Sequence, residues 1–294
     1  MTSWTPNHLI EPNWQAPLRP NRGGYTVTMR EAHGALECLA LLAAMPASPT
    51  MASLHIGWGS FRNLDIVAAR GSGAALLLDI NVHQLRVWRA VLTALQSART
   101  PTRFVEAVVP MLPQRPRLRQ FSDDTRAWLL TETRREGSWL QASRPERYAH
   151  VRKLAIDGMI AVGCLDMRGG VSGDGRFTRL AAKLDLARQA GFEPDTLYVS
   201  NVPWMLAQPH GFFGEDHSQF LPQEVPGSAI TRARANLAEI APYFRNIVCA
   251  IHRAPHSRPD DLHWETRLLT PGEFIADASW RELMGFQDLA GLSR

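Results

Sequence analysis

Short apolar segments alternate along this chain with segments whose apolar residues recur at helical spacing. The segment AALLLDI, residues 74–80, is a continuous apolar run of the kind that parallel sheets contain when both faces are covered. Helical patterns at Phe61–Arg70 and Asn81–Ala98 flank it. Further strand-like runs lie at residues 50–57, 158–167, 195–202, 246–254 and 263–275. This alternation predicts an α/β fold, a Rossmann-like open parallel sheet sandwiched by helices.

Two parts of the chain lie outside this alternation. Residues 1–50 are predicted to be an N-terminal arm followed by a helix over Thr28–Ala44, where apolar residues have helical spacing and prolines follow. Residues 51–294 then form the α/β domain. Within this domain, residues 99–153 break the rhythm with helical patterns joined by proline-rich and basic turns. We expect them to form a helical insertion.

The composition is that of an ordinary folded protein, with 45% hydrophobic and 20% charged residues among 294. The formal net charge is +4, and nearly all basic residues are arginine, a bias typical of a GC-rich bacterial genome. The densest basic stretch, residues 113–121, has no aromatic–basic repeat around it, so we expect no nucleic-acid partner. Cys38, Cys164 and Cys249 lie far apart in apolar surroundings, which predicts buried thiols rather than disulfides or a zinc site.

The sequence contains no segment typical of a membrane span. The longest apolar run, residues 35–45, includes Glu37 and is too short to cross a bilayer. Residues 1–20 are polar and contain prolines, unlike a secretory signal. We therefore expect a cytoplasmic protein without a membrane partner. The sequence does not decide between a monomer and a homodimer.

Ligands of open parallel sheets bind outside the carboxyl ends of the strands, so the residues that end the strands are the candidates. The first strand ends in Gly57, Trp58, Gly59 and Ser60. Glycine there permits a positive φ and a close approach of the backbone to a ligand, and the next helix directs its N-terminus at the same place. The stretch also fits a tight backbone corner, and it lacks the third glycine of a dinucleotide-binding turn.

Carboxylates are predicted to end the next two strands. Asp79 follows Gly57 by 22 positions, where a carboxylate can accept hydrogen bonds from both hydroxyls of a ribose. Its alternative is to cap the following helix, a role that Asn81 also fits; Asn81 is in addition a candidate cofactor-binding residue. Asp166 is predicted either to accept from the exocyclic amine of adenine or to cap its own turn. Together with the glycine turn, these acids predict a nucleoside-binding site.

The fourth strand ends in the stretch SNVPW, which begins with Ser200, a candidate cofactor-binding residue. Asn201 offers an amide that could orient an amine, and the ring of Trp204 would attract a cationic group. His210, in the loop that follows, is a candidate general base near neutral pH. Tyr25 is a candidate lid residue over the cofactor. The ordinary alternatives are a proline-terminated strand with Trp204 in the core and a solvent-facing connector around His210.

Other catalytic chemistries lack their motifs. The chain contains neither a G-x-S-x-G elbow nor a P-loop, which argues against a serine hydrolase and against phosphate transfer. His252 and His256 have helical spacing, but Pro255 interrupts it and no carboxylate of the H-E-x-x-H type is nearby. We therefore expect no metal site.

In their order along residues 53–255, these features resemble the class I S-adenosylmethionine-dependent methyltransferase superfamily. The stretch LHIGWGS is similar to its glycine-rich first motif, Asp79 to its ribose-binding acid and Asp166 to its adenine-binding acid. SNVPW is similar to the (N/D)-P-P-(Y/F/W) motif of the amine-methylating members. His55 stands near the place of the acid in the first motif, and Val202 replaces the first proline of the last. The resemblance implies S-adenosylmethionine as cofactor and methyl transfer to a nitrogen or oxygen of a small molecule.

A second resemblance lies in DINVHQL, residues 79–85. It looks like the D-x-N-x-x-Q stretch of enzymes that move the 3-amino-3-carboxypropyl arm of the same cofactor, as in nicotianamine and betaine-lipid biosynthesis. This resemblance implies transfer of that arm, or its cyclisation, with release of methylthioadenosine. Gln84 is the last residue of the stretch, and its ordinary alternative is a surface residue on the helix. Two further alternatives are a dinucleotide-dependent oxidoreductase, disfavoured by the missing third glycine, and a non-catalytic nucleoside-binding protein.

Overall fold

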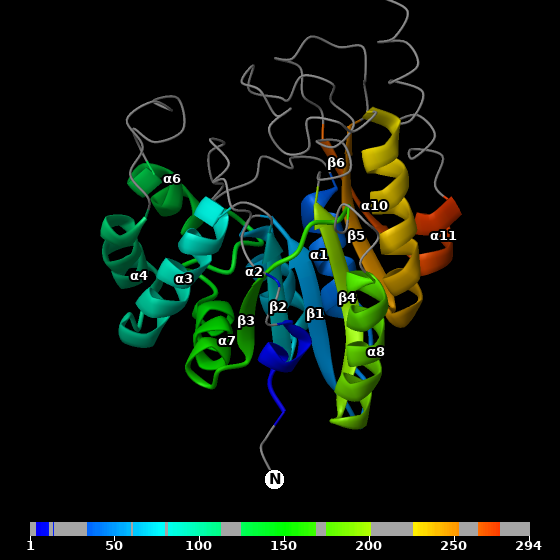
Figure 1. Ribbon diagram of the computed structural model, residues 1–294. Helices are drawn as coiled ribbons and strands as arrows, with labels where there is room; N and C mark the ends of the chain where they lie inside the picture. Colours follow the sequence, from blue (N-terminus) through cyan, green and yellow to red (C-terminus); the bar gives the residue numbers. More distant parts are fainter. Residues whose placement is uncertain are drawn as a thin grey trace, which may run out of the picture.

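The computed structural model describes residues 4–11, 14, 34–59, 61–79, 82–112, 125–168, 175–200, 226–252 and 264–276. These residues form a six-stranded sheet with helices on both faces, and the predicted Rossmann-like α/β fold is confirmed (Figure 1). The strands lie in the order β3-β2-β1-β4-β5-β6. Their bounds are β1 Ala52–Trp58, β2 Ala74–Asp79, β3 Ile160–Cys164, β4 Phe192–Ser200, β5 Asn246–His252 and β6 Trp264–Leu269.

The strand order contains one reversal of winding. From β1 the chain builds β2 and β3 on one side, and it then returns to place β4 and β5 on the other side of β1, all in parallel. Only β6 runs antiparallel, beside β5. Open α/β sheets bind their ligands where such a reversal occurs, outside the carboxyl ends of the two central strands. We call this place, between Gly59 after β1 and Ser200 at the end of β4, the switch point.

Two helical layers cover the sheet, because successive side chains of a strand point to opposite faces. The first layer consists of α8 (Arg176–Gln189), α10 (Pro226–Ile240) and α11 (Pro271–Ala276). The second consists of α1 (Ala35–Ala44), α2 (Arg62–Arg70), α3 (Val82–Ser97) and α7 (Pro145–Ile156). In Figure 1, α8 and α10 lie in front of the sheet and α1 lies behind it.

Short 3-10 segments complete the described structure. They are η1 (Pro6–Leu9), η2 (Val109–Met111) and η4 (Ala241–Tyr243). The first, η1, packs on β2, β3 and α8, where Leu9 is fully buried. Lys183 of α8 holds this segment by an ion pair to Glu11 at 2.7 Å. The N-terminal segment therefore belongs to the layer of α8.

The range predicted as a helical insertion contains α4 (Pro101–Val108), α6 (Thr125–Glu132) and α7. An aromatic cluster joins them, since the ring centroid of Trp139 lies 5.1 Å from that of Phe104 and 5.8 Å from that of Tyr148. Phe61, which directly precedes α2, and Trp88 of α3 belong to the same buried cluster. The insertion therefore shares one core with the helices of the sheet.

Several element boundaries differ from those that the sequence predicts. Of the helix expected over Thr28–Ala44, α1 begins at Ala35, and residues 28–33 lie outside the described residues. Gly34, with a φ of 72°, precedes α1 and packs so closely that a Cβ there would lie 2.5 Å from the carbonyl oxygen of Thr266. The third strand ends at Cys164 rather than at Asp166. The fourth starts earlier, at Phe192, and the last predicted strand is β6 followed by the short helix α11.

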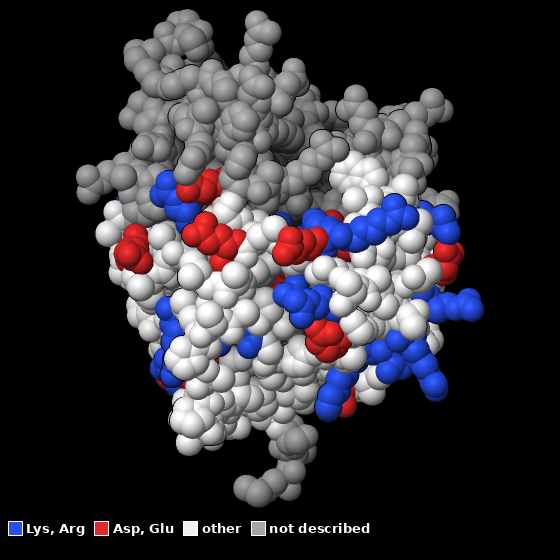
Figure 2. Space-filling view, turned by 180° about the vertical axis from the view of Figure 1, so that it is seen from behind, with Lys and Arg blue, Asp and Glu red and all other residues white. Residues whose placement is uncertain are grey.

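The surface seen from behind the sheet carries mixed charge. Basic and acidic side chains lie next to one another across the middle of this face (Figure 2). Exposed pairs of this kind include Arg126 with Glu106 at 2.6 Å and the Lys153–Asp157 pair of α7. Such pairs contribute little to stability, because solvent screens both partners.

Two predictions from composition can be compared with the described residues. Cys38, Cys164 and Cys249 are buried thiols that form no disulfide with one another, as predicted. No helix in the described ranges has the length and apolar character needed to cross a membrane.

Candidate functional site

Buried hydrogen bonds hold the turn that follows β1. Nε2 of His55 lies 2.9 Å from Oδ1 of Asn63, and Nδ2 of Asn63 donates to the carbonyl of Trp58 at 3.2 Å. Because an amide oxygen only accepts, the proton of this first bond is on Nε2 of His55. Asn63 lies in the first turn of α2. Its side chain therefore ties the start of the helix back to the strand.

The two glycines of the turn are required for different reasons. A Cβ on Gly57 would lie 1.9 Å from Oδ1 of Asn63 and 2.9 Å from Cβ of Tyr198, so only glycine leaves room for the packing beneath the turn. Gly57 is also still part of β1. Gly59 instead has a φ of 90°, and the atoms nearest to a Cβ there belong to Ser200, at 3.4 Å and beyond. The turn itself therefore begins at Gly59, where the backbone conformation favours glycine.

His55 is a neutral internal residue. It is fully buried, and burial lowers its pKa to about 4, against the opposing effects of its hydrogen bond to Asn63 and of the charge on Asp195. Its Nδ1 has no hydrogen-bond partner in the part of the chain that the structure describes. His55 therefore contributes an uncharged hydrogen-bond donor to the packing beneath the turn.

The side chain of Trp58 lies in the core. Its indole Nε1 donates to the carbonyl of Leu165 at 2.9 Å, just after β3. Its ring stacks on Phe177 of α8 with 6.4 Å between ring centroids and 10° between planes. With 2% of its surface exposed, Trp58 joins β1 to the end of β3 and presents only its backbone at the switch point.

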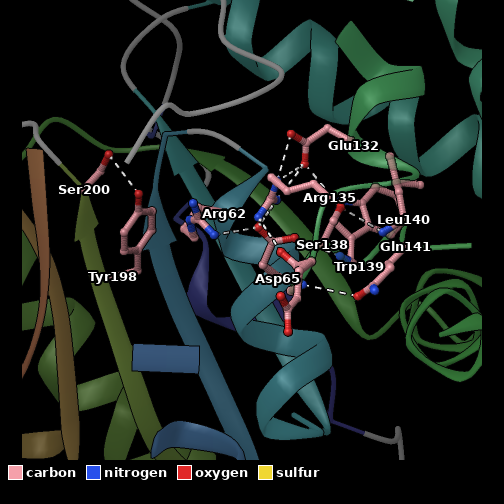
Figure 3. A network of polar contacts seen from close by, with 12 residues as sticks. Arg62, Asp65, Glu132, Arg135, Ser138, Trp139, Leu140, Gln141, Tyr198 and Ser200 are labelled. Atoms are coloured by element: carbon pink, nitrogen blue, oxygen red, sulfur yellow. Dashed lines mark hydrogen bonds and ion pairs between the residues drawn. The ribbon is translucent and has the colours of Figure 1, made fainter. Parts of the chain in front are cut away.

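Ser200 ends β4 in an unusual backbone conformation. Its φ is 55°, and it is the only non-glycine residue with a positive φ in the described ranges. The pairing of β4 with β5 also shifts by one residue between Tyr198 and Ser200. The hydroxyl of Tyr198 donates to Oγ of Ser200 at 3.2 Å, and both residues are buried (Figure 3). Ser200 therefore lies at the switch point, beside Gly59.

Asp79 and Asp166 gather at the same edge of the sheet. Asp79 is the half-buried last residue of β2 and pairs in register with Cys164 of β3. Burial and then the charges of Asp79 and Asp166 raise the pKa of the Cys164 thiol to about 11, while Arg176 at the start of α8 opposes the shift. Cys164 is therefore a protonated thiol at neutral pH and a poor nucleophile.

The contacts of Asp166 correspond to the turn-capping alternative. Its Oδ1 accepts from the backbone nitrogen of Arg168 at 2.9 Å. Both carboxylate oxygens accept from Nε of the same residue, and Oδ2 accepts from Nη2 at 2.6 Å. A carboxylate has about four acceptor positions, so an adenine amine would have to share this group with Arg168. The adenine role of Asp166 stays a prediction.

A buried ionic cluster bonds the insertion to α2 (Figure 3). Oδ2 of Asp65 accepts from Arg62 at 3.1 Å and from Arg135 at 2.6 Å, and Oδ1 accepts from the backbone nitrogen of Trp139 at 2.8 Å. Arg135 also pairs with Glu132 at 2.6 Å. The charges of the two arginines and two carboxylates balance, as buried charges require. The cluster fixes the insertion to the helix that starts at the switch point.

Gln84 occupies the first turn of α3 and is 3% exposed. The surface alternative for this residue is therefore wrong. It lies five positions after Asp79, which places a buried amide near the carboxyl end of β2.

The structure brings several predicted residues together and leaves others undescribed. Those at the carboxyl edge of the sheet are Gly57, Trp58, Gly59, Asp79, Asp166 and Ser200. Those outside the described residues are Tyr25, Ser60, Asn81, Asn201, Trp204 and His210. No group of three or more His, Cys, Asp or Glu side chains in the described ranges could hold a metal ion.

Two residues that build the site were not predicted from the sequence. Asn63 carries a recognisable signal, since a polar side chain in the first turn of a helix can reach back to the preceding strand. Tyr198 carries none beyond its place in a buried strand, where a tyrosine hydroxyl needs a partner.

Comparison with known proteins gives no family assignment. No protein-family model matches the chain, and no curated protein matches its sequence. The strand order, the turn after β1 and the side chains at the strand ends are therefore the features that bear on its function.

Proposed function

We propose that the chain is an S-adenosylmethionine-dependent enzyme that binds this cofactor at the switch point and acts on a small molecule. Methyl transfer to a nitrogen or oxygen acceptor is the leading reaction. The observation that carries the proposal is the placement of a left-handed glycine, Gly59, directly beside a strand-terminal carboxylate, Asp79.

The register of β1 and β2 supports this placement. Trp58 pairs with Leu78, and the backbone nitrogen of Gly59 donates to the carbonyl of Leu78 at 3.2 Å. Gly59 follows Trp58, and Asp79 follows Leu78, so these two residues come directly after the last pair of the two strands. A nucleoside over the glycine turn would therefore place its ribose hydroxyls toward the carboxylate, which accepts hydrogen bonds from both.

The direction of β6 supports a single nucleoside rather than a dinucleotide. A dinucleotide-binding sheet consists of two β-α-β-α-β halves with parallel strands. In this chain β6 runs antiparallel to β5, so the second half does not repeat the first. The missing third glycine after Gly59 favours the same conclusion.

The residues of the site would bind and orient, since the sulfonium of the bound cofactor supplies an already activated carbon. Gly59 lets the backbone approach the nucleoside, and Asp79 holds the ribose. Ser200 bounds the opposite side of the switch point. Transfer from the sulfonium to an acceptor requires no nucleophile from the chain. This agrees with the protonated state of Cys164 and the buried, neutral state of His55. Proximity and alignment of the acceptor then account for the rate.

The burial of Gln84 favours a second candidate, use of the 3-amino-3-carboxypropyl arm of the same cofactor. Asp79 and Gln84 are two of the three residues in the D-x-N-x-x-Q stretch, and both lie at the carboxyl end of β2 or directly after it. The amide of Gln84 carries both donor and acceptor groups, the kind that the amino and carboxylate groups of that arm would bind. This chemistry would release methylthioadenosine.

The test is to incubate the purified chain with S-adenosylmethionine alone and with a panel of small amines and alcohols, and to identify the nucleoside products. S-Adenosylhomocysteine formed with an acceptor supports methyl transfer, and methylthioadenosine formed without one supports the second candidate. Calorimetry with S-adenosylmethionine and with NAD⁺ provides the binding control. Absence of S-adenosylmethionine binding at sub-millimolar concentration would contradict the proposal and favour a different role for the fold.

A further inference from the structure

We propose that Tyr198 is a positioning residue of the switch point. Through Ser200, its hydroxyl holds the carboxyl end of β4 against the Gly59 turn, and this contact sets the space for the sulfonium end of S-adenosylmethionine. The inference rests on the proposed function and assigns a role in it to a residue that lies below the ligand.

The first observation is the backbone at the end of β4. Ser200 has a φ of 55°, in the left-handed region that side chains rarely adopt. Between Tyr198 and Ser200 the pairing with β5 skips a residue, so β4 is bulged where it ends. Bulges redirect side chains and occur next to active sites, and a strained residue persists only where its surroundings hold it.

The second observation is the contact that supports this conformation. The ring of Tyr198 is fully buried among α1, Ile66 and Val248, on the face opposite Trp58. Its position leaves the hydroxyl within 3.2 Å of Oγ of Ser200, to which it donates. The hydroxyl on the packed ring of Tyr198 thus donates a hydrogen bond to Ser200, the residue with the strained backbone, from the core side of the sheet end.

The third observation is the contact across the switch point. The atoms closest to a Cβ on Gly59 would be Oγ and Cβ of Ser200, at 3.4 and 3.6 Å. A Cβ on Gly59 would thus be in ordinary van der Waals contact with Ser200, so the gap between the ends of β1 and β4 is about one carbon atom wide and any movement of Ser200 changes it. Transfer from a sulfonium needs the reacting atoms in line, so a small change there affects the arm of the cofactor more than its nucleoside.

The test replaces Tyr198 by phenylalanine and uses Tyr148 for a matched control. Tyr198→Phe keeps the buried ring and removes the hydrogen bond to Ser200. Tyr148→Phe removes an equivalent buried bond, from the hydroxyl to the carbonyl of Ala98 at 2.9 Å, within the insertion. Each variant loses the hydrogen bond of a buried tyrosine hydroxyl, so Tyr148→Phe controls for the general effect of that loss on thermal stability.

We expect Tyr198→Phe to weaken S-adenosylmethionine binding about fivefold, the effect of one lost hydrogen bond. Its affinity for adenosine, which lacks the sulfonium arm, should stay within about twofold of the wild type, because Asp79 is unchanged. Tyr148→Phe should bind both ligands as the wild type does. Equal weakening of both ligands by Tyr198→Phe would show a merely structural role and overturn the inference, as would wild-type binding of both.

Amide hydrogen exchange without ligand separates this inference from the proposed function. In Tyr198→Phe, the peptides covering residues 54–59 and 196–200 should exchange faster than in the wild type, and in Tyr148→Phe they should not. If the wild-type chain binds no S-adenosylmethionine, the proposed function is wrong, and unchanged exchange in Tyr198→Phe shows separately that Tyr198 does not hold the switch point.

Discussion

The amide oxygen of Asn63 occupies the space that a side chain on Gly57 would need. A Cβ on Gly57 would lie 1.9 Å from that oxygen, which itself receives the hydrogen bond from His55 at 2.9 Å. The glycine within β1 thus follows from the packing of a strand against the first turn of its own helix. Only Gly59, with its φ of 90°, belongs to the turn that would face a ligand.

Replacing Gly57 by alanine should destabilise the fold. The new methyl group collides with Asn63 and forces apart the buried hydrogen bond to His55, which together should lower the free energy of unfolding by about 3 kcal/mol. Urea denaturation of Gly57→Ala and wild type measures the difference. Gly272→Ala lies in α11, where the new Cβ would meet open space, and it should not lower the free energy of unfolding. Wild-type stability of Gly57→Ala would mean that Asn63 can turn away without cost.

The buried His55 should make the fold less stable in mild acid. Its pKa is about 4 in the folded chain and 6.5 in the unfolded chain, so the unfolded chain binds more protons between these values. The free energy of unfolding should therefore fall as the pH drops from 6.5 to 4, by about 3 kcal/mol for this residue. The pH dependence of urea denaturation tests this. His55→Gln keeps a donor toward Asn63 but does not titrate, and its stability should fall less over that range. If the free energy of unfolding fell equally with pH in the wild type and in His55→Gln, the assignment of His55 as a buried residue with a lowered pKa would be contradicted.

The sequence predicts the fold well because the signals are local. A continuous apolar run such as residues 74–80, between two helical patterns, is visible in a short window and indicates a buried parallel strand. The residue at which a strand ends is harder to predict, because the polar residue that ends an apolar run need not be the residue that ends the pairing. Asp166, for example, follows the last residue of β3 by two positions. Strand order and the antiparallel direction of β6 depend on pairing between distant segments.

The residues at the strand ends could be predicted because their signals are also local in the sequence. Gly59, Asp79 and Ser200 follow apolar runs, so the sequence already places them at the edge where ligands bind. The contacts beneath them were not predictable. The position of Asn63 in the first turn of a helix indicates a bond back to the strand, but its fit into the space at Gly57 and the bond from Tyr198 to Ser200 depend on side-chain directions that only the packed fold determines.

The ion pair between Arg70 and Asp195 should be important for stability. It joins α2 to β4 with two hydrogen bonds of 2.7 and 2.9 Å, and both side chains are buried. Asp195→Ala leaves the Arg70 charge without its carboxylate and should cost about 3 kcal/mol or more in the free energy of unfolding. Glu106→Ala breaks the exposed pair with Arg126 and should cost less than about 1 kcal/mol. Similar costs for the two variants in urea denaturation would contradict the importance of the buried pair.

Removing the carboxylate of Asp79 should abolish most cofactor affinity while leaving the fold intact. Asp79 is half-buried at the end of β2, so Asp79→Ala creates no large core cavity. Two hydrogen bonds from ribose hydroxyls to a carboxylate would be lost, and the dissociation constant for S-adenosylmethionine should rise at least about tenfold. Isothermal calorimetry measures the affinity, and circular dichroism with thermal unfolding verifies the fold.

The control for Asp79 is Asp157→Ala in α7, which removes an exposed carboxylate paired with Lys153. It changes the net charge by the same amount, so it separates loss of a ribose contact from a general electrostatic effect on a cationic ligand. The Asp157 variant should bind S-adenosylmethionine as the wild type does. Unchanged affinity in Asp79→Ala would remove the ribose assignment. Equal losses in both variants would show that charge alone attracts the ligand, because only a contact at the carboxyl end of β2 distinguishes the two aspartates.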